Sequence, residues 1–312
     1  MTDIGNKQAP SLWHRVTDSD LFHRYIGSPT AVFATTVGLV MILAALFAPL
    51  IAPQDPYDIA ALQLMNAFYP PAWQDGGSAS FLLGTDDQGR DLLSAILYGT
   101  RTSLFVSCVS VGCAVIIGVL VGLFSGYFGR LFDAIAMRIV DIQMTFPAIM
   151  VALLIDGVTK TILSPDLHDQ LAIVVIILAL TQSIWPQIAR TVRASTMVQA
   201  RKDYVVAAQV IGISPTVILF RHILPNVLGP VLVIATINIG VAVIGEATLS
   251  FLGVGIPASQ PSLGALIRNG NNYLFSGEQW LAIFPGIALG LLILSVNLTG
   301  DWLRDILDPK LR

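Results

Sequence analysis

The densest group of charged side chains in this sequence lies at residues 83–104, which read LGTDDQGRDLLSAILYGTRTSL. If the segment is helical, Asp86, Asp87, Arg90 and Asp91 fall within one or two turns, where Asp87 meets Arg90 at i,i+3 and Asp91 at i,i+4. Such groups support recognition and ion pairing. Two interpretations stay open: a solvated helix at a membrane surface, whose ion pairs add little stability, or a surface that contacts another protein or lines an outer gate.

Two further polar pairs interrupt apolar stretches. Arg138 and Asp141 are spaced i,i+3, and charges inside a membrane helix face a partner or a cavity. A structural ion pair between them is favoured over a ligand contact. Glu246 follows Asn238 on another apolar stretch, where its carboxylate can meet a positive group of a ligand or pair with a neighbouring protein. These four residues are our candidates for a gate or a translocation path.

The sequence offers no catalytic or metal-binding constellation. A phosphate-binding loop needs Gly-Lys followed by Ser or Thr, but the four lysines follow Asn6, Thr159, Arg201 and Pro309. The four histidines are scattered, and Cys108 and Cys113 lie on different faces of one apolar stretch, so neither a metal site nor a disulfide is predicted. Any energy source must therefore belong to another chain.

The elements that position these residues are membrane-spanning helices. Of the 312 residues, 54% are hydrophobic and 12% are charged, and mean hydropathy is +0.74. About 25% charged residues would be usual for a soluble domain. The first apolar stretch is too long for a signal-peptide core, so we expect it to be retained. A helix needs roughly 20 apolar residues to cross the bilayer, and six stretches are candidates: 29–51, 103–124, 137–155, 171–189, 227–249 and 281–299.

The distribution of positive charge predicts the orientation of these spans. Only Arg90, Arg101, Lys160 and Arg268 of the 17 Lys and Arg residues fall in segments outside the membrane if the N-terminus is inside. The positive-inside rule then predicts that both termini are cytoplasmic. The net charge of −3 gives no reason to expect a nucleic-acid partner. The predicted parts are an N-terminal segment at 1–28, an outer loop at 52–102, a core at 103–300 with a cytoplasmic loop at 190–226, and a tail at 301–312.

The cytoplasmic loop contains a pattern typical of two short helices, KDYVVAAQVIGISPTVILFRHILPN at 202–226. Asp203 can cap the first helix, and Gly212 can end it in a left-handed conformation. Ser214 then stands at an N-cap with Pro215 in the first turn, the favoured start of a second helix. Pro225 is expected to end that helix just before the fifth span.

This loop resembles the cytoplasmic motif of prokaryotic ABC importer permeases, EAA-x3-G-x9-I-x-L-P. Ala207 and Ala208 are followed after three residues by Gly212, and after nine more by residues 222–225. Val206 replaces the Glu of the motif, so no docking carboxylate is expected there. The resemblance implies a coupling helix that docks on a separate ATPase subunit. The predicted coupling residues are Asp203, Tyr204, Ala207, Ala208, Gly212, Ser214 and Pro215.

Four further segments narrow the resemblance: 83–104, 137–147, 245–255 and 297–312. Each is similar to the matching segment of the C-type permeases of dipeptide and oligopeptide importers, a group that includes nickel and glutathione importers. The resemblance covers residue 25 to the end. It implies an all-α membrane protein with six spans, a type I ABC importer permease fold, in a bacterial inner membrane.

The same resemblance implies partners and places the cofactors elsewhere. The expected partners are a homologous B-type permease, two ATPase subunits that hold ATP and magnesium, a substrate-binding protein and membrane lipid. The candidate contacts of the binding protein are Asp86, Asp87, Arg90 and Asp91. An ATP-independent secondary transporter is disfavoured, because no repeat relates the two halves of the sequence. A scaffold without a transport role would leave the motif spacing unexplained.

Overall fold

The computed structural model describes residues 25–56, 58, 64–257 and 260–307. Most of the predicted N-terminal segment 1–28 and part of the predicted tail 301–312 lie outside these residues. Every regular element in the described part is helical, apart from one isolated bridge between Thr85 and Asp91. The chain is therefore all-α there, as predicted from its apolar stretches.

Five of the helices are long and apolar enough to cross a membrane. Short elements flank them: α4 (Ala48–Ile51), a single 3₁₀ turn (Leu64–Asn66), α9 (Asp203–Val210), α10 (Pro215–Val217) and α12 (Leu263–Asn272). The five long helices are α3 (Pro29–Leu46), α5 (Leu92–Phe128), α8 (Pro165–Gln199), α11 (Leu224–Phe251) and α13 (Trp280–Leu307).

The third predicted span is a broken pair of helices. α6 (Arg130–Thr145) and α7 (Ala148–Ile162) meet at an angle of 89°. Phe146 is extended (φ −88°, ψ 131°) because the residue before a proline avoids the helical region, and Pro147 cannot donate a backbone hydrogen bond. Pro147 thus bends the chain as predicted, but the expected helix 137–155 does not run straight through it. With this pair counted as one span, the total is six.

α5 and α8 form the centre of the bundle, and glycines let them approach closely. Gly118, Gly122 and Gly126 stand on one face of α5, spaced by four residues. A Cβ atom at Gly122 would lie 2.6 Å from the carbonyl oxygen of Ala189 on α8. Small residues at this spacing are a common helix–helix interface in membranes, because packing replaces the hydrophobic effect there.

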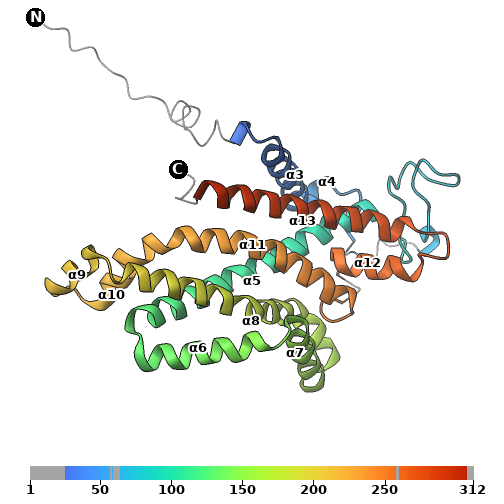
Figure 1. Ribbon diagram of the computed structural model, residues 1–312. Helices are drawn as coiled ribbons and strands as arrows, with labels where there is room; N and C mark the ends of the chain where they lie inside the picture. The colour runs from blue at the N-terminus through green and yellow to red at the C-terminus, as the bar shows by residue number, and fades with distance from the viewer. Residues whose placement is uncertain (1–24, 57, 59–63, 258–259, 308–312) are drawn as a thin grey trace, which may run out of the picture.

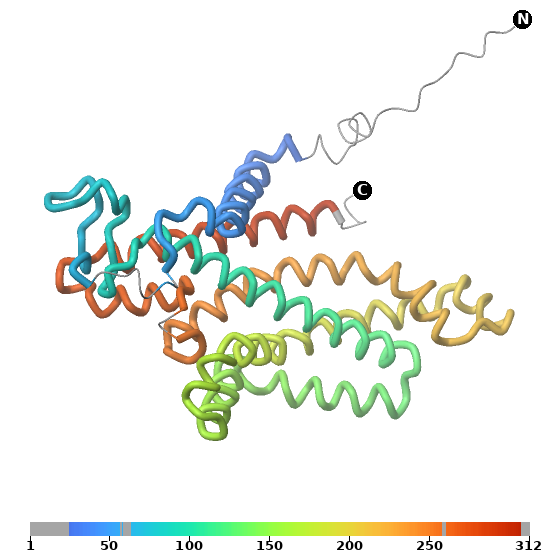
Figure 2. The backbone as a smooth tube through the Cα atoms, turned by 180° about the vertical axis from the view of Figure 1, so that it is seen from behind, coloured from blue at the N-terminus to red at the C-terminus, as the bar shows by residue number. Residues whose placement is uncertain are grey.

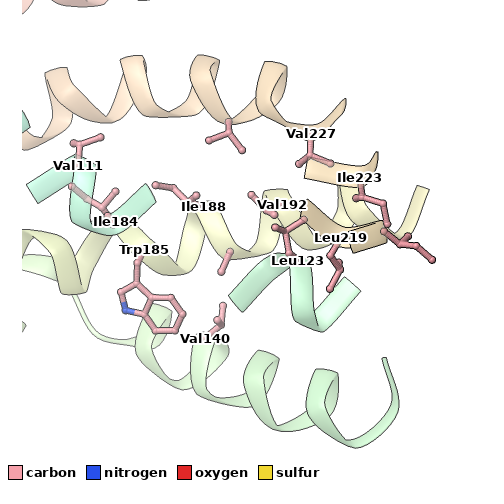
Figure 3. Close-up of a cluster of buried hydrophobic side chains, with 14 of the residues drawn as sticks. Val111, Leu123, Val140, Ile184, Trp185, Ile188, Val192, Leu219, Ile223 and Val227 are labelled. Carbon is pink, nitrogen blue, oxygen red and sulfur yellow. The ribbon is translucent and has the colours of Figure 1, made fainter. Parts of the chain in front are cut away.

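The buried apolar core lies between α5, α6, α8 and α11. Figure 3 shows Val111 and Leu123 of α5, Ile188 and Val192 of α8, and Val227 of α11 spread along the space between these helices. Leu123, Ile188, Val192 and Val227 are at most 1% exposed. This core extends to the end of the bundle at which α9 and α10 lie and includes Val205 and Ala208, so it connects the predicted coupling loop to α5, α6, α8 and α11.

The long helices alternate in direction. The start of α3, the end of α13 and the α9–α10 segment lie toward one end of the molecule, whereas α12 and the loop between α4 and α5 lie toward the other (Figures 1 and 2). This arrangement is the one that the charge distribution requires. Which end faces the cytoplasm stays a prediction from the positive-inside rule.

Candidate functional site

The predicted coupling loop forms an elbow, which we define as residues 203–217. α9 ends at Val210, and Gly212, just past its C-cap, has a φ of +84°, the left-handed conformation expected after a helix C-terminus. The backbone N–H of Ile213 donates to the carbonyl of Ala208 at 3.0 Å and closes the turn. Ser214 is the N-cap residue of the next helix and Pro215 stands in its first turn. These three assignments from the sequence are confirmed.

Two details of the elbow differ from expectation. Lys202 occupies the N-cap position of α9 and makes no side-chain cap, while Asp203 is already the first helical residue. Pro225 does not end the second helix, because the chain runs as one helix from Pro215 to Phe251. A π-helical turn at Ile218–Ile223, closed by the N–H of Leu224 on the carbonyl of Leu219, widens the helix just before the proline.

One side of the elbow packs on the core and the other side is exposed. Val205 and Ala208 are 0% and 5% exposed, whereas Val210 and Ile211 are 83% and 78% exposed. The Tyr204 hydroxyl donates to Gln199 Oε1 at 3.0 Å, which ties the elbow to the end of α8. The elbow is therefore fixed to the bundle while it presents apolar side chains outward.

The predicted charged helix at 86–91 is instead a compact loop. Asp86 Oδ1 accepts hydrogen bonds from the backbone N–H groups of Gln88 and Arg90, both at 2.9 Å. Its Oδ2 accepts from Arg90 Nε at 2.6 Å, and both side chains are nearly fully buried. An Asp side chain that bonds to backbone amides two and four residues ahead favours a turn over a helix. α5 begins only after Asp91.

Asp91 caps α5 from inside the protein. Its Oδ2 accepts from the Ser94 N–H at 2.8 Å, while its Oδ1 has no hydrogen-bond partner among the described residues. Burial raises the pKa of the Asp91 carboxyl, and the hydrogen bonds from Ser94 oppose that shift in part. Asp86, Arg90 and Asp91 are thus buried within this chain, and Asp87 is half-buried. Their proposed contact with a binding protein stays a prediction.

Asp141 pairs with a residue other than the predicted one. Its Oδ1 accepts from Arg190 Nη2 of α8 at 2.6 Å, and both side chains are more than half exposed. Arg138 forms no ion pair among the described residues, so the expected i,i+3 pair is wrong. The bundle brings α8 alongside α6, and this offers Asp141 an arginine that sequence spacing on one helix does not reveal.

A second ion pair joins α6 and α8, and it was not predicted from the sequence. Arg193 Nη2 of α8 donates to Asp133 Oδ2 of α6 at 2.6 Å, and Arg193 Nε donates to the other carboxylate oxygen. Ser125 of α5 also donates to Asp133. Asp133 therefore joins three helices at the end of the bundle nearest the elbow. Its partners are 60 and eight residues away, and no local pattern in the sequence marks them.

Glu246 and Asn238 lie inside the chain. Glu246 is 0% exposed, and its carboxylate accepts from Ser103 Oγ at 2.6 Å and Ser250 Oγ at 2.7 Å. Asn238 Nδ2 donates to the carbonyl of Ile234, four residues earlier on the same helix. The serines that hold Glu246 were not predicted, since isolated serines on apolar helices carry no distinctive signal. The gate role of the pair stays a prediction.

Comparison with known proteins shows the family. Residues 118–312 match the binding-protein-dependent transport system inner membrane components, and residues 11–71 match the N-terminal transmembrane domain of oligopeptide transport permease C. The chain belongs to this family of inner-membrane transport components. It is a multi-pass membrane protein with the predicted type I ABC importer permease fold, and the resemblance seen in the sequence is confirmed.

Individual relatives cover nearly the whole chain. It is 38% identical to the dipeptide transport system permease protein DppC of Haemophilus influenzae, over 88% of each chain. It is 39% identical to the Escherichia coli K12 protein of the same name over 94% of this chain and 93% of the relative, and 34% identical to the di/tripeptide transport system permease protein DppC of Pseudomonas aeruginosa over 97% and 95%.

A solved structure supports the fold. The inward-facing MetNI methionine ABC transporter superposes with a TM-score of 0.55 at 21% identity, covering 70% of this chain and 98% of that one. At this sequence identity the match supports only the arrangement of the helices.

Proposed function

We propose that this chain is a non-catalytic permease subunit of an ATP-driven importer of dipeptides and short oligopeptides. With a homologous B-type permease it encloses the translocation path. The observation that carries the proposal is the elbow, whose exposed Val210 and Ile211 stand at the end of α9, a short turn before the helix Pro215–Phe251 that includes a membrane span. The peptide cargo is supported by the names of the relatives that align along 88–97% of the chain.

The elbow supports docking on an ATPase subunit. Burying a side chain the size of isoleucine is worth about 1.5–3 kcal/mol, so two exposed aliphatic residues at a rigid tip favour a protein partner. Two ATPase subunits that bind ATP and magnesium supply the energy, because this sequence has no phosphate-binding loop of its own. A binding protein delivers the peptide at the opposite end.

The arrangement of the helices also supports a cytoplasmic position for the elbow. We place the elbow, the start of α3 and the end of α13 on the cytoplasmic side, where the positive-inside rule puts most of the Lys and Arg residues. An ATPase in the cytoplasm can then reach Val210 and Ile211.

Reconstitution tests the proposal. The complete importer in proteoliposomes takes up labelled L-alanyl-L-alanine with its binding protein and ATP, and Ile211→Asp lowers both ATPase co-purification and uptake about tenfold or more. Leu64→Asp is the matched control, since Leu64 is 76% exposed on the loop at the other end of the molecule. Uptake that continues without ATP, or full ATPase retention by Ile211→Asp, contradicts the proposal.

A further inference from the structure

A polar cleft opens at the end of the molecule opposite the elbow. It has a volume of about 280 Å³ and lies between the loop at 85–90, the segment after α11 and helix α12. Figure 1 shows α12 at that end. The polar side chains that line the cleft are Asp87, Gln88, Arg90, Ser250, Gln260, Arg268, Asn269 and Asn272.

Arg268 is seated in this cleft by a glycine. Gly253 has a φ of +80°, and the Arg268 guanidinium lies where a Cβ atom of residue 253 would stand. The left-handed backbone conformation favours glycine at this position, and the absence of a side chain there leaves room for the guanidinium. Arg268 is exposed and forms no ion pair among the described residues. The guanidinium of Arg268 is thus a positive charge at the cleft that no carboxylate of the described residues neutralises.

Asp87 supplies a negative charge on the other wall. Asn269 Nδ2 donates to Asp87 Oδ1 at 2.6 Å and fixes the orientation of the carboxylate. The charge of Asp87 raises the pKa of the Tyr273 hydroxyl, which is the effect expected of an ionised neighbour. Asp87 is half-buried, so one side of the carboxylate faces the cleft.

The two charges face one cleft without joining. Asp86 and Arg90, the next charges along the loop, form a buried ion pair at 2.6 Å, and no ion pair links Asp87 to Arg268. Opposite charges held apart by separate supports, with space between them, are complementary to a small molecule that carries both charges.

We propose that this cleft is a transit subsite for a zwitterionic peptide. Arg268 binds the terminal carboxylate and Asp87 binds the terminal ammonium, with the Asn269 and Asn272 amides beside them. The inference rests on the proposed function, since it takes a peptide as cargo. Both charges are near solvent, so binding is weak, and weak binding suits a site through which a substrate must pass.

Saturation-transfer NMR tests this subsite directly. The purified importer complex in lipid nanodiscs, without binding protein, is mixed with millimolar L-alanyl-L-alanine. Signal transfer is expected for the wild-type protein and falls about two- to fivefold in Arg268→Gln and in Asp87→Asn, the range for a partly screened ion pair. Asn at position 87 keeps an oxygen for Asn269, so the second variant leaves the loop intact. Assembly of each variant is checked by ATPase co-purification.

Capped peptides and a matched arginine sharpen the test. The C-terminal amide of the dipeptide is expected to lose its dependence on Arg268, and the N-acetyl form its dependence on Asp87. Arg101→Gln, an exposed arginine on α5 with no ion pair among the described residues, is expected to change nothing.

Equal transfer in all variants, or none in the wild type, overturns the subsite. If the subsite is overturned but ATP-driven peptide uptake persists, the proposed function still holds. If Arg268→Gln loses the stimulation of transport by the binding protein, Arg268 acts in protein docking and the subsite is overturned.

Discussion

Replacing Gly122 by alanine should separate α5 from α8. The new Cβ atom would lie 2.6 Å from the Ala189 carbonyl oxygen and 2.6 Å from Val192 Cβ, about 0.8 Å short of an ordinary 3.4 Å contact. Neither neighbour is the flexible end of a side chain, so the helices themselves must move. Overpacking of this kind costs about 1–3 kcal/mol, and here it acts on backbone, which favours the upper part of that range.

Gly112 on the same helix is the matched control. A Cβ atom there meets nothing within 4 Å. Gly112→Ala therefore receives only the gain in helix propensity, about 1 kcal/mol, whereas Gly122→Ala receives the same gain and the clash.

Thermal unfolding of the purified complex, followed by size-exclusion chromatography after heating, should show a lower midpoint for Gly122→Ala and an unchanged or higher one for Gly112→Ala. Equal midpoints for the two variants would refute close packing at the glycine face.

Further predictions concern the ion pairs and the buried carboxylates. Asp133→Asn should weaken the α6–α8 contact by about 1–3 kcal/mol, because it removes a charge-assisted pair shared by three helices. The expected result is a lower thermal unfolding midpoint and reduced peptide uptake. Asp141→Asn, on an exposed pair, should shift the same midpoint by less than about 1 kcal/mol. Because the pKa of Asp91 is raised, the folded protein binds the proton of this carboxyl more tightly than the unfolded chain does. The protonated carboxyl therefore stabilises the folded state below the pKa of the unfolded chain, and this stabilisation is lost as the pH rises through the pKa of the folded state. Asp91→Asn should therefore be at least as stable as the wild type at pH 7, and the difference between them should shrink toward pH 4; a constant difference across that range contradicts the assignment. Glu246→Leu should lower the melting midpoint, since the Ser103 and Ser250 hydroxyls lose their acceptor.

The sequence predicted features with a local cause. Gly212, Ser214 and Pro215 form the elbow because helix ends are set by the conformations these residues prefer within a few positions. Pro147 bends the third span for the same kind of reason. Long apolar stretches predicted the membrane helices, since length and hydropathy are properties of a single segment.

Features that depend on segments distant in the sequence were missed or misassigned. Asp141 pairs with Arg190 of another helix, and the loop that contains Asp86 is joined to helix α12 through the hydrogen bond from Asn269 to Asp87. The glycine face of α5 was also not predicted, although a small residue every four positions, as at Gly118, Gly122 and Gly126, is visible in the sequence and is typical of a packing face. The π-helical turn that carries the chain past Pro225 has no such signal.

The unbroken helix from Pro215 to Phe251 makes the elbow one arm of a lever. At 1.5 Å per residue its 37 residues span about 55 Å. About two-thirds of the way along it, Gly240 lies directly against the side chain of Asn297 of α13. For a rod that turns about this point, the arm toward the elbow is roughly 38 Å and the arm toward Phe251 roughly 16 Å. A force applied at Ile211 then moves the far end of the helix in the opposite direction. The displacement there is about half as large and the force about twice as large. Such a lever suits the separation of tightly packed helices over a short distance.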